Sequence, residues 1–205
     1  MLAITRAALL MFSLSLYAGA QSRTLALYAG GANGLNASAI QAAQIELQRI
    51  LLPTGFEIVW KDLQLRKSSE QFDQVVVLTF DGTCSAAGTP SASRRAGKRQ
   101  DVGLADSSVS NGQVLPFFRV DCEYLAQMLD SALRSMNEGE RDVVFGRALA
   151  RIMAHEIYHI TGQTKEHQER GVAKASFSVH DLTTSRFDFD AWSLAQIRTH
   201  RSFAD

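Results

Sequence analysis

The residues of this chain with the clearest capacity for chemistry lie between positions 155 and 167. His155, Glu156 and His159 form the pattern H-E-x-x-H, and Gly162 and His167 follow it. Histidines four positions apart project from the same face of a helix and can bind one metal ion. The carboxylate between them can act as a general base toward water at that ion. The stretch therefore predicts a metal site with hydrolytic chemistry.

A pattern with only three fixed positions also arises by chance, so its context in the sequence matters. Three of the five histidines in the chain fall within these thirteen residues. Such a concentration is expected where imidazole is the ligand type. The alternative is a helix whose histidines belong to the core or the surface and bind nothing.

The stretch resembles the metzincin zinc proteases, whose extended motif is H-E-x-x-H-x-x-G-x-x-H. His155, Glu156, His159 and Gly162 match it position for position. The family spacing places the third histidine at position 165, whereas the nearest histidine here is His167, two positions later. A loop accommodates such an insertion at little cost. The resemblance implies Zn²⁺ bound by three histidines, His167 being the third, with Glu156 as the catalytic residue.

Other side chains downstream of the motif are alternatives for the third ligand. Glu166, Glu169, His180 and Asp181 each carry a group that binds zinc. A glutamate ligand would come from a following helix, and Glu169 lies too close to the exit of the motif helix for that. Asp181 serves equally well as a helix N-cap. His167 is preferred because the site already uses imidazole.

A second departure from the metzincins concerns the floor of the site. That family has a methionine in a tight turn beneath the zinc, whereas every methionine of this chain precedes the motif. Residues 171–178 occupy the corresponding place in the sequence. Phe177 and Ser176 are candidates to replace the methionine, and an ordinary packed loop is the alternative.

Helices must position these residues. Apolar side chains recur at three- and four-residue steps from 142 to 160, which predicts a helix with one buried face. These side chains are Val144, Phe145, Ala148, Leu149, Ile152 and Met153. Ser38 and Gln41 are expected to form the capping box of an earlier helix. Asp121 is expected to cap another helix immediately before the motif helix.

Apolar runs predict the strands of a sheet. The runs are residues 24–28, 56–60, 74–80, 102–109 and 113–120. The last two flank Asn111-Gly112, a strong hairpin signal. The order of elements, together with the resemblance, implies an α/β (α+β) zincin-like fold with a mixed twisted sheet and a small C-terminal subdomain. The resemblance also implies an edge strand above the zinc that pairs with an extended peptide, and residues 102–109 or 113–120 are the candidates for it.

Residues 1–20 have the features of a secretory signal peptide. Arg6 precedes a short apolar run that ends in small residues suited to cleavage. An uncleaved N-terminal anchor is the alternative. We expect residues 21–205 to form one catalytic domain, with an upper part over about 21–162 and a C-terminal part over about 163–205. The mature protein is expected to be secreted or periplasmic, without stable membrane insertion.

The two cysteines bear on this localisation. Cys84 and Cys122 each follow an apolar run that reads as a strand. Adjacent strands would bring these ends together, and an exported chain with two cysteines favours one disulfide. Two buried free thiols are the alternative.

The charge balance excludes some partners. The chain has 21 basic and 21 acidic residues, which gives a formal net charge of zero. It therefore offers no reason to expect binding to nucleic acid or to an acidic membrane. Four basic residues between 94 and 99 read as a solvated loop, with a proteolytic processing site as the alternative.

The sequence thus favours a secreted zinc endopeptidase that acts on peptide or protein substrates. A catalytically degenerate, metal-binding envelope or secreted protein on the same fold is the main alternative. It is favoured by the displaced third histidine and the missing methionine, and disfavoured by the intact Glu156. A metal-independent protein with a chance motif is the third interpretation.

Overall fold

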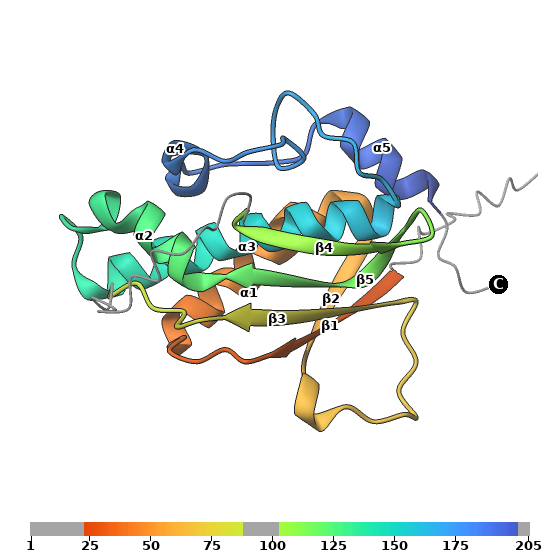
Figure 1. Cartoon of the computed structure of the whole chain (residues 1–205), viewed down its shortest axis with the longest axis horizontal. Helices are drawn as coiled ribbons and strands as arrows, with labels where there is room; N and C mark the ends of the chain where they lie inside the picture. The colour runs from red at the N-terminus through yellow and green to blue at the C-terminus, as the bar shows by residue number, and fades with distance from the viewer. Residues whose placement is uncertain (1–22, 88–102, 201–205) are drawn as a thin grey trace, which may run out of the picture.

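The described part of the chain, residues 23–87 and 103–200 of a computed structural model, is built around a twisted sheet (Figure 1). Its five strands lie in the order β2-β1-β3-β5-β4. The strands are β1 (Arg23–Gly30), β2 (Phe56–Asp62), β3 (Gln74–Asp81), β4 (Ala105–Ser110) and β5 (Gln113–Asp121). All neighbours are parallel except β4 and β5, which form an antiparallel pair. The expected mixed α/β architecture is confirmed.

The helices divide into two groups. They are α1 (Ala37–Leu51), α2 (Cys122–Leu133), α3 (Glu138–Gly162), α4 (Val179–Thr183) and α5 (Ala191–Thr199), with short 3₁₀ turns at Leu52–Thr54 and Leu63–Leu65. α1 and α3 pack against each other behind the sheet, while α4 and α5 belong to a C-terminal segment that runs over α3 (Figure 1). The core of apolar side chains lies between the sheet and these two long helices.

α3 is the 25-residue helix that carries the H-E-x-x-H pattern. It begins one turn earlier than the apolar pattern indicates, because Asn137 and Glu140 form a capping box there. It ends at Gly162, and Gln163 follows in the left-handed conformation with φ of 44°. Its second half is almost wholly buried, which fixes the orientation of the motif.

The expected cap of α1 is wrong. Asn36, and not Ser38, caps this helix, with its side-chain oxygen accepting a hydrogen bond from the backbone N–H of Ala39. Asparagine and serine have similar N-cap preferences, so the local pattern did not discriminate between them. Asp121 does cap α2, as the sequence predicts, by accepting from the backbone N–H of Tyr124.

The hairpin between β4 and β5 is confirmed. Asn111 and Gly112 both have positive φ, 50° and 82°, as a type I′ turn requires. β4 is the edge strand of the sheet and β5 is internal, so β4 is the hairpin strand at the edge. The register shifts between Ser107 and Val109, opposite the stretch of β5 that contains Pro116. Proline lacks the N–H for a regular ladder, which accounts for a bulge at this point.

The disulfide between Cys84 and Cys122 is confirmed. It joins the chain just after β3 to the first residue of α2, and both cysteines are fully buried. Parallel pairing of β3 with β5 brings the two ends together, as the sequence predicts.

Replacing Cys84 and Cys122 by serine should lower the free energy of unfolding. The crosslink closes a loop with a sequence separation of 38 residues. Removing it frees that loop in the unfolded chain and should cost about 2–4 kcal/mol. Urea titration of the oxidised wild type and the double variant measures the difference. Equal unfolding midpoints at equal slopes would contradict the prediction.

Some expectations concern residues outside the described part. The signal peptide over 1–20 and the basic stretch between 94 and 99 both lie there. Within residues 23–87 and 103–200, no helix combines the length and the apolar composition that crossing a bilayer requires.

Candidate metal centre

The structure brings His155, His159 and His167 together. The first two project from one face of α3, and the third lies in the loop after that helix. One nitrogen from each ring belongs to a group in which all ligand atoms lie within 4.8 Å of one another. His155 and His159 are each 8% exposed, whereas His167 is exposed. The cluster is thus open on the side of the loop.

Backbone carbonyls fix the orientation of the two helical histidines. His155 Nδ1 lies 2.8 Å from the carbonyl oxygen of Val172, and His159 Nδ1 lies 2.8 Å from that of Thr164. Because a carbonyl only accepts, each Nδ1 must carry the proton and donate. Each Nε2 is therefore left with a bare lone pair.

These two Nε2 atoms face each other at 3.0 Å. Two lone pairs at this distance repel each other unless a cation or a proton lies between them. Nitrogens bound about 2.0–2.1 Å from one tetrahedral zinc would lie roughly 3.4 Å apart. The observed spacing, from 3.0 Å up to the 4.8 Å limit of the cluster, brackets this value. The donor set and its spacing therefore fit a zinc ion.

Burial favours the neutral form of all three imidazoles. It lowers the pKa of His155 to about 3, and the neighbouring His159 and His167 contribute to the shift. Burial likewise lowers the pKa of His159 and of His167. Neutral imidazole is the form that ligates metals, so the site is ready to accept a cation at neutral pH.

Glu156 follows His155 on α3 and is 5% exposed. Its carboxylate accepts a short hydrogen bond from the hydroxyl of Ser107 on β4. Burial raises the pKa of Glu156 to about 7, the Ser107 hydrogen bond opposes this shift, and the charge of Asp106 adds to it. A carboxylate with a pKa near neutrality can both accept and return a proton at physiological pH.

The segment after α3 forms one wall of the cluster. The ring of Phe177 meets that of His155 edge-on, with centroids 5.3 Å apart. Of the two candidates for the floor of the site, Phe177 is therefore the one whose ring contacts a cluster histidine. Tyr158 is fully buried, and its hydroxyl donates to the carbonyl of Glu166, 3.2 Å away.

The alternative third ligands do not join the cluster. Within the described residues, the group of possible ligands contains only the three histidines. Asp181 instead forms an ion pair with Lys174. Its expected role as an N-cap is wrong: Ser178 caps α4, and Asp181 is the third residue of that helix, where its carboxylate accepts from the backbone N–H of Ser178. His180 lies on α4 and is exposed.

The chain was compared with known proteins and with solved structures. Neither a protein family nor a curated relative matches the sequence. Among solved structures, the chain is similar to archaemetzincin from Methanopyrus kandleri, with 13% identity and a TM-score of 0.49. The likeness covers 89% of this chain and 97% of that one. A likeness of this size says nothing of activity, so the chemistry of the site rests on its own geometry.

Two residues at the site are absent from the sequence-based expectations. Ser107 lies 49 positions before Glu156, and only the register of β4 brings them together. Pro116 was the available signal, because a proline inside a strand marks a bulge that can redirect a neighbouring side chain. Gln163 is the second residue: its side chain accepts from the N–H of Val114 and donates to its carbonyl, which ties the end of α3 to β5.

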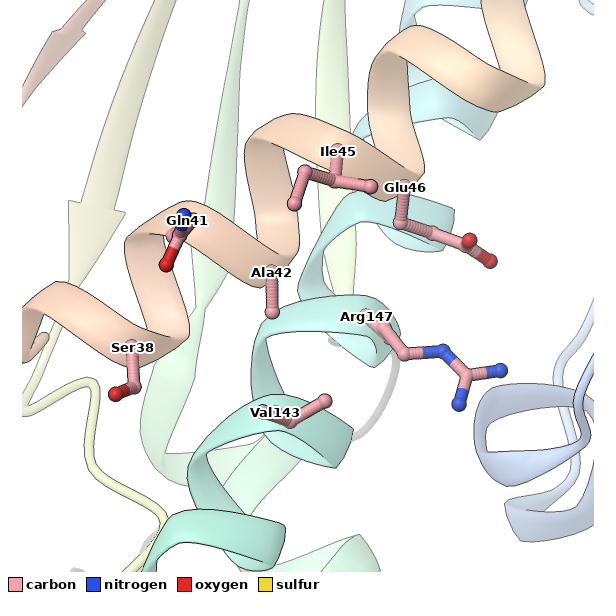
Figure 2. A pocket seen from close by; sticks show the side chains of 7 residues that line it. All are labelled: Ser38, Gln41, Ala42, Ile45, Glu46, Val143 and Arg147. Carbon is pink, nitrogen blue, oxygen red and sulfur yellow. The ribbon is translucent and has the colours of Figure 1, made fainter.

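A separate hollow of about 320 Å³ lies between α1 and α3 (Figure 2). Its lining consists of Ser38, Gln41, Ala42, Ile45, Glu46, Val143 and Arg147. Glu46 is already bound by Arg49 and Arg151, and Arg147 donates to the carbonyl of Thr184. The charged groups of this hollow are therefore committed to structural contacts, and no histidine of the cluster lines it.

Proposed function

We propose that this protein is an exported, zinc-dependent endopeptidase. The observation that carries the proposal is the pair of bare imidazole lone pairs 3.0 Å apart, on a helix that also carries the buried Glu156 directly after His155. A structural metal site would have no need of that carboxylate. Export is supported by the disulfide, together with the signal-like residues 1–20, which lie outside the described part.

In this proposal His155, His159 and His167 bind the zinc, and their neutral rings leave its charge uncompensated. When bound, zinc supplies a Lewis acid that polarises a peptide carbonyl and acidifies water. Glu156 takes the proton from the attacking water and delivers it to the leaving amine. The hydroxyl of Ser107 donates to one carboxylate oxygen of Glu156 and restrains the side chain, which leaves the other oxygen free to accept that proton.

β4 is suited to hold an extended peptide. It is the edge strand of the sheet, and among the described strands only β5 pairs with it. Its Ser107 reaches Glu156, so a peptide that pairs with its free edge would run past the proposed base. Backbone pairing of this kind gives affinity that depends little on side-chain identity.

The deciding experiment is cleavage of a denatured protein and a peptide library, followed by mass spectrometry. Metal is first removed with a chelator and then restored as Zn²⁺. We expect internal cleavage only in the zinc-restored sample. A protein that binds zinc but leaves every substrate intact would instead be the degenerate, metal-binding alternative. One that binds no zinc would refute the proposed site.

Ser107→Ala should slow the reaction while leaving substrate binding intact. Loss of a hydrogen bond to a charged group costs about 1.5–3 kcal/mol, or roughly a 10- to 100-fold fall in kcat. KM should stay within about twofold, because the edge of β4 retains its backbone groups. Steady-state kinetics on a cleaved peptide measures both, with Ser110→Ala on the same strand as the control. A threonine at 107 should restore much of kcat, and a kcat unchanged in Ser107→Ala would exclude a role in holding the base.

A further inference from the structure

Arg151 lies one helical turn before His155 on α3 and is completely buried. A buried guanidinium is costly unless all of its hydrogen bonds find partners. Here Nε donates to Glu46 at 2.9 Å, and the other two nitrogens donate to the backbone carbonyls of Asp181 and Thr184 at 2.7 and 2.8 Å. Arg151 thus joins α1 and α3 to the C-terminal segment.

Glu46 connects this arginine to a second one. It also accepts from Arg49 at 2.9 and 3.0 Å. Arg49 in turn forms an ion pair with the carboxylate of Asp188 and donates to the carbonyl of Phe187 at 3.1 Å. We call Glu46, Arg49 and Arg151 the arginine cluster. It holds the C-terminal segment by backbone carbonyls at three points and by one carboxylate.

The held segment leads directly to His155. The backbone N–H of Val172 donates to the carbonyl of Asp188 at 3.1 Å, and the carbonyl of Val172 accepts from His155 Nδ1. Gly171 permits this close approach: it has φ of 68°, and a Cβ there would lie 2.4 Å from the Asp188 carbonyl oxygen. One series of contacts therefore runs from Arg49 through the carboxylate and carbonyl of Asp188 and the backbone of Val172 to the ring of His155.

A second route runs through aromatic rings. The Arg151 guanidinium lies 5.8 Å from the centroid of the Phe187 ring. Phe187 meets Phe177 edge-on at 5.6 Å, and Phe177 meets His155 edge-on at 5.3 Å. Both routes end at the same imidazole, one at its Nδ1 and the other at its ring.

We propose that the arginine cluster is a positioning device for the metal ligand His155. By holding residues 181–188 it fixes both the Val172 carbonyl, which sets the tautomer, and Phe177, which supports the ring. The inference rests on the metal-binding part of the proposed function and is independent of peptide hydrolysis.

Arg49→Gln is the variant that tests this positioning. Arg49 is partly exposed, so its loss is tolerated better than that of the fully buried Arg151. Loss of a group that orients a ligand typically lowers metal affinity 10- to 100-fold. We expect about a 10-fold loss of Zn²⁺ affinity, measured by competition with a chromophoric chelator, and a changed visible spectrum of the Co²⁺ form. Arg49→Lys keeps the ion pair with Asp188, so its Zn²⁺ affinity should lie between those of the wild type and Arg49→Gln.

Two controls separate positioning from general destabilisation. Arg134→Gln removes an arginine whose ion pair, within the part of the chain that the structure describes, is with Asp130 on α2, and it should leave affinity and spectrum unchanged. Val76→Ala removes buried volume from β3 and should lower stability without changing the Co²⁺ spectrum. The proposal is overturned if Arg49→Gln binds zinc as the wild type does, or loses affinity only as far as Val76→Ala does. A wild type that binds no metal would overturn it together with the proposed site, whereas one that binds metal but cleaves nothing would refute the peptidase alone.

Discussion

Glu156→Ala should bind zinc as tightly as the wild type and lose nearly all hydrolysis. Glu156 is not a member of the histidine cluster, so its removal leaves the three nitrogen donors intact. A positioned general base contributes about 100- to 10,000-fold to a rate. Peptide cleavage followed by mass spectrometry measures the activity, and metal analysis of the same sample measures the zinc.

The matched control for this variant is Glu138→Ala. Glu138 is an exposed glutamate in the first turn of the same helix, far along the chain from the motif. The Glu138→Ala variant should cleave at the wild-type rate. It should lose only a little stability, because a negative charge near the helix N-terminus is removed. If Glu156→Ala retains the wild-type rate, another group takes the proton and the assignment of the base is wrong.

Replacing His155 or His159 by alanine should abolish tight zinc binding. Each provides a buried nitrogen whose orientation is fixed by a carbonyl, so its loss should exceed the 10- to 100-fold effect of removing a supporting group. His167→Ala is expected to weaken binding less, because His167 is exposed and lies in a loop. Zinc stoichiometry after dialysis against a weak chelator ranks the three variants.

His180→Ala is the control, since this exposed histidine lies on α4 outside the cluster. It should bind one zinc with wild-type affinity. If His167→Ala retains zinc fully, another group is the third ligand and His167 is an ordinary loop residue.

The sequence predicted what local physical rules determine. The hairpin followed from Asn111-Gly112, the motif helix from its apolar spacing, and the cap of α2 from Asp121. The disulfide was also within reach, because parallel strands bring their ends together. The start of α1 was misassigned to Ser38 for want of any signal that separates neighbouring capping residues.

What the sequence could not supply are contacts between distant residues. Ser107 and Glu156 are 49 positions apart, and Glu46 and Arg151 are 105 apart. Neither pair has a spacing that local periodicity reports. The position of Arg151 in an otherwise apolar helical stretch does indicate that it has partners, because a charged side chain needs them when it is buried. Its partners depend on how the C-terminal segment crosses α3, and no local pattern encodes that path.

The link between Gln163 and β5 has a consequence for motion. Because the amide side chain of Gln163 both accepts from and donates to the backbone of Val114, the exit of α3 and the hairpin are expected to move as one rigid body. Movement around the histidine cluster is then expected in residues 164–190, the segment that follows α3 and carries His167 and Phe177. Hydrogen–deuterium exchange offers a direct gauge: the Val114 amide should stay protected while the amides of that segment exchange sooner. Equal exchange rates for the Val114 amide and for the amides of residues 164–190 would mean that the hairpin and this segment open together.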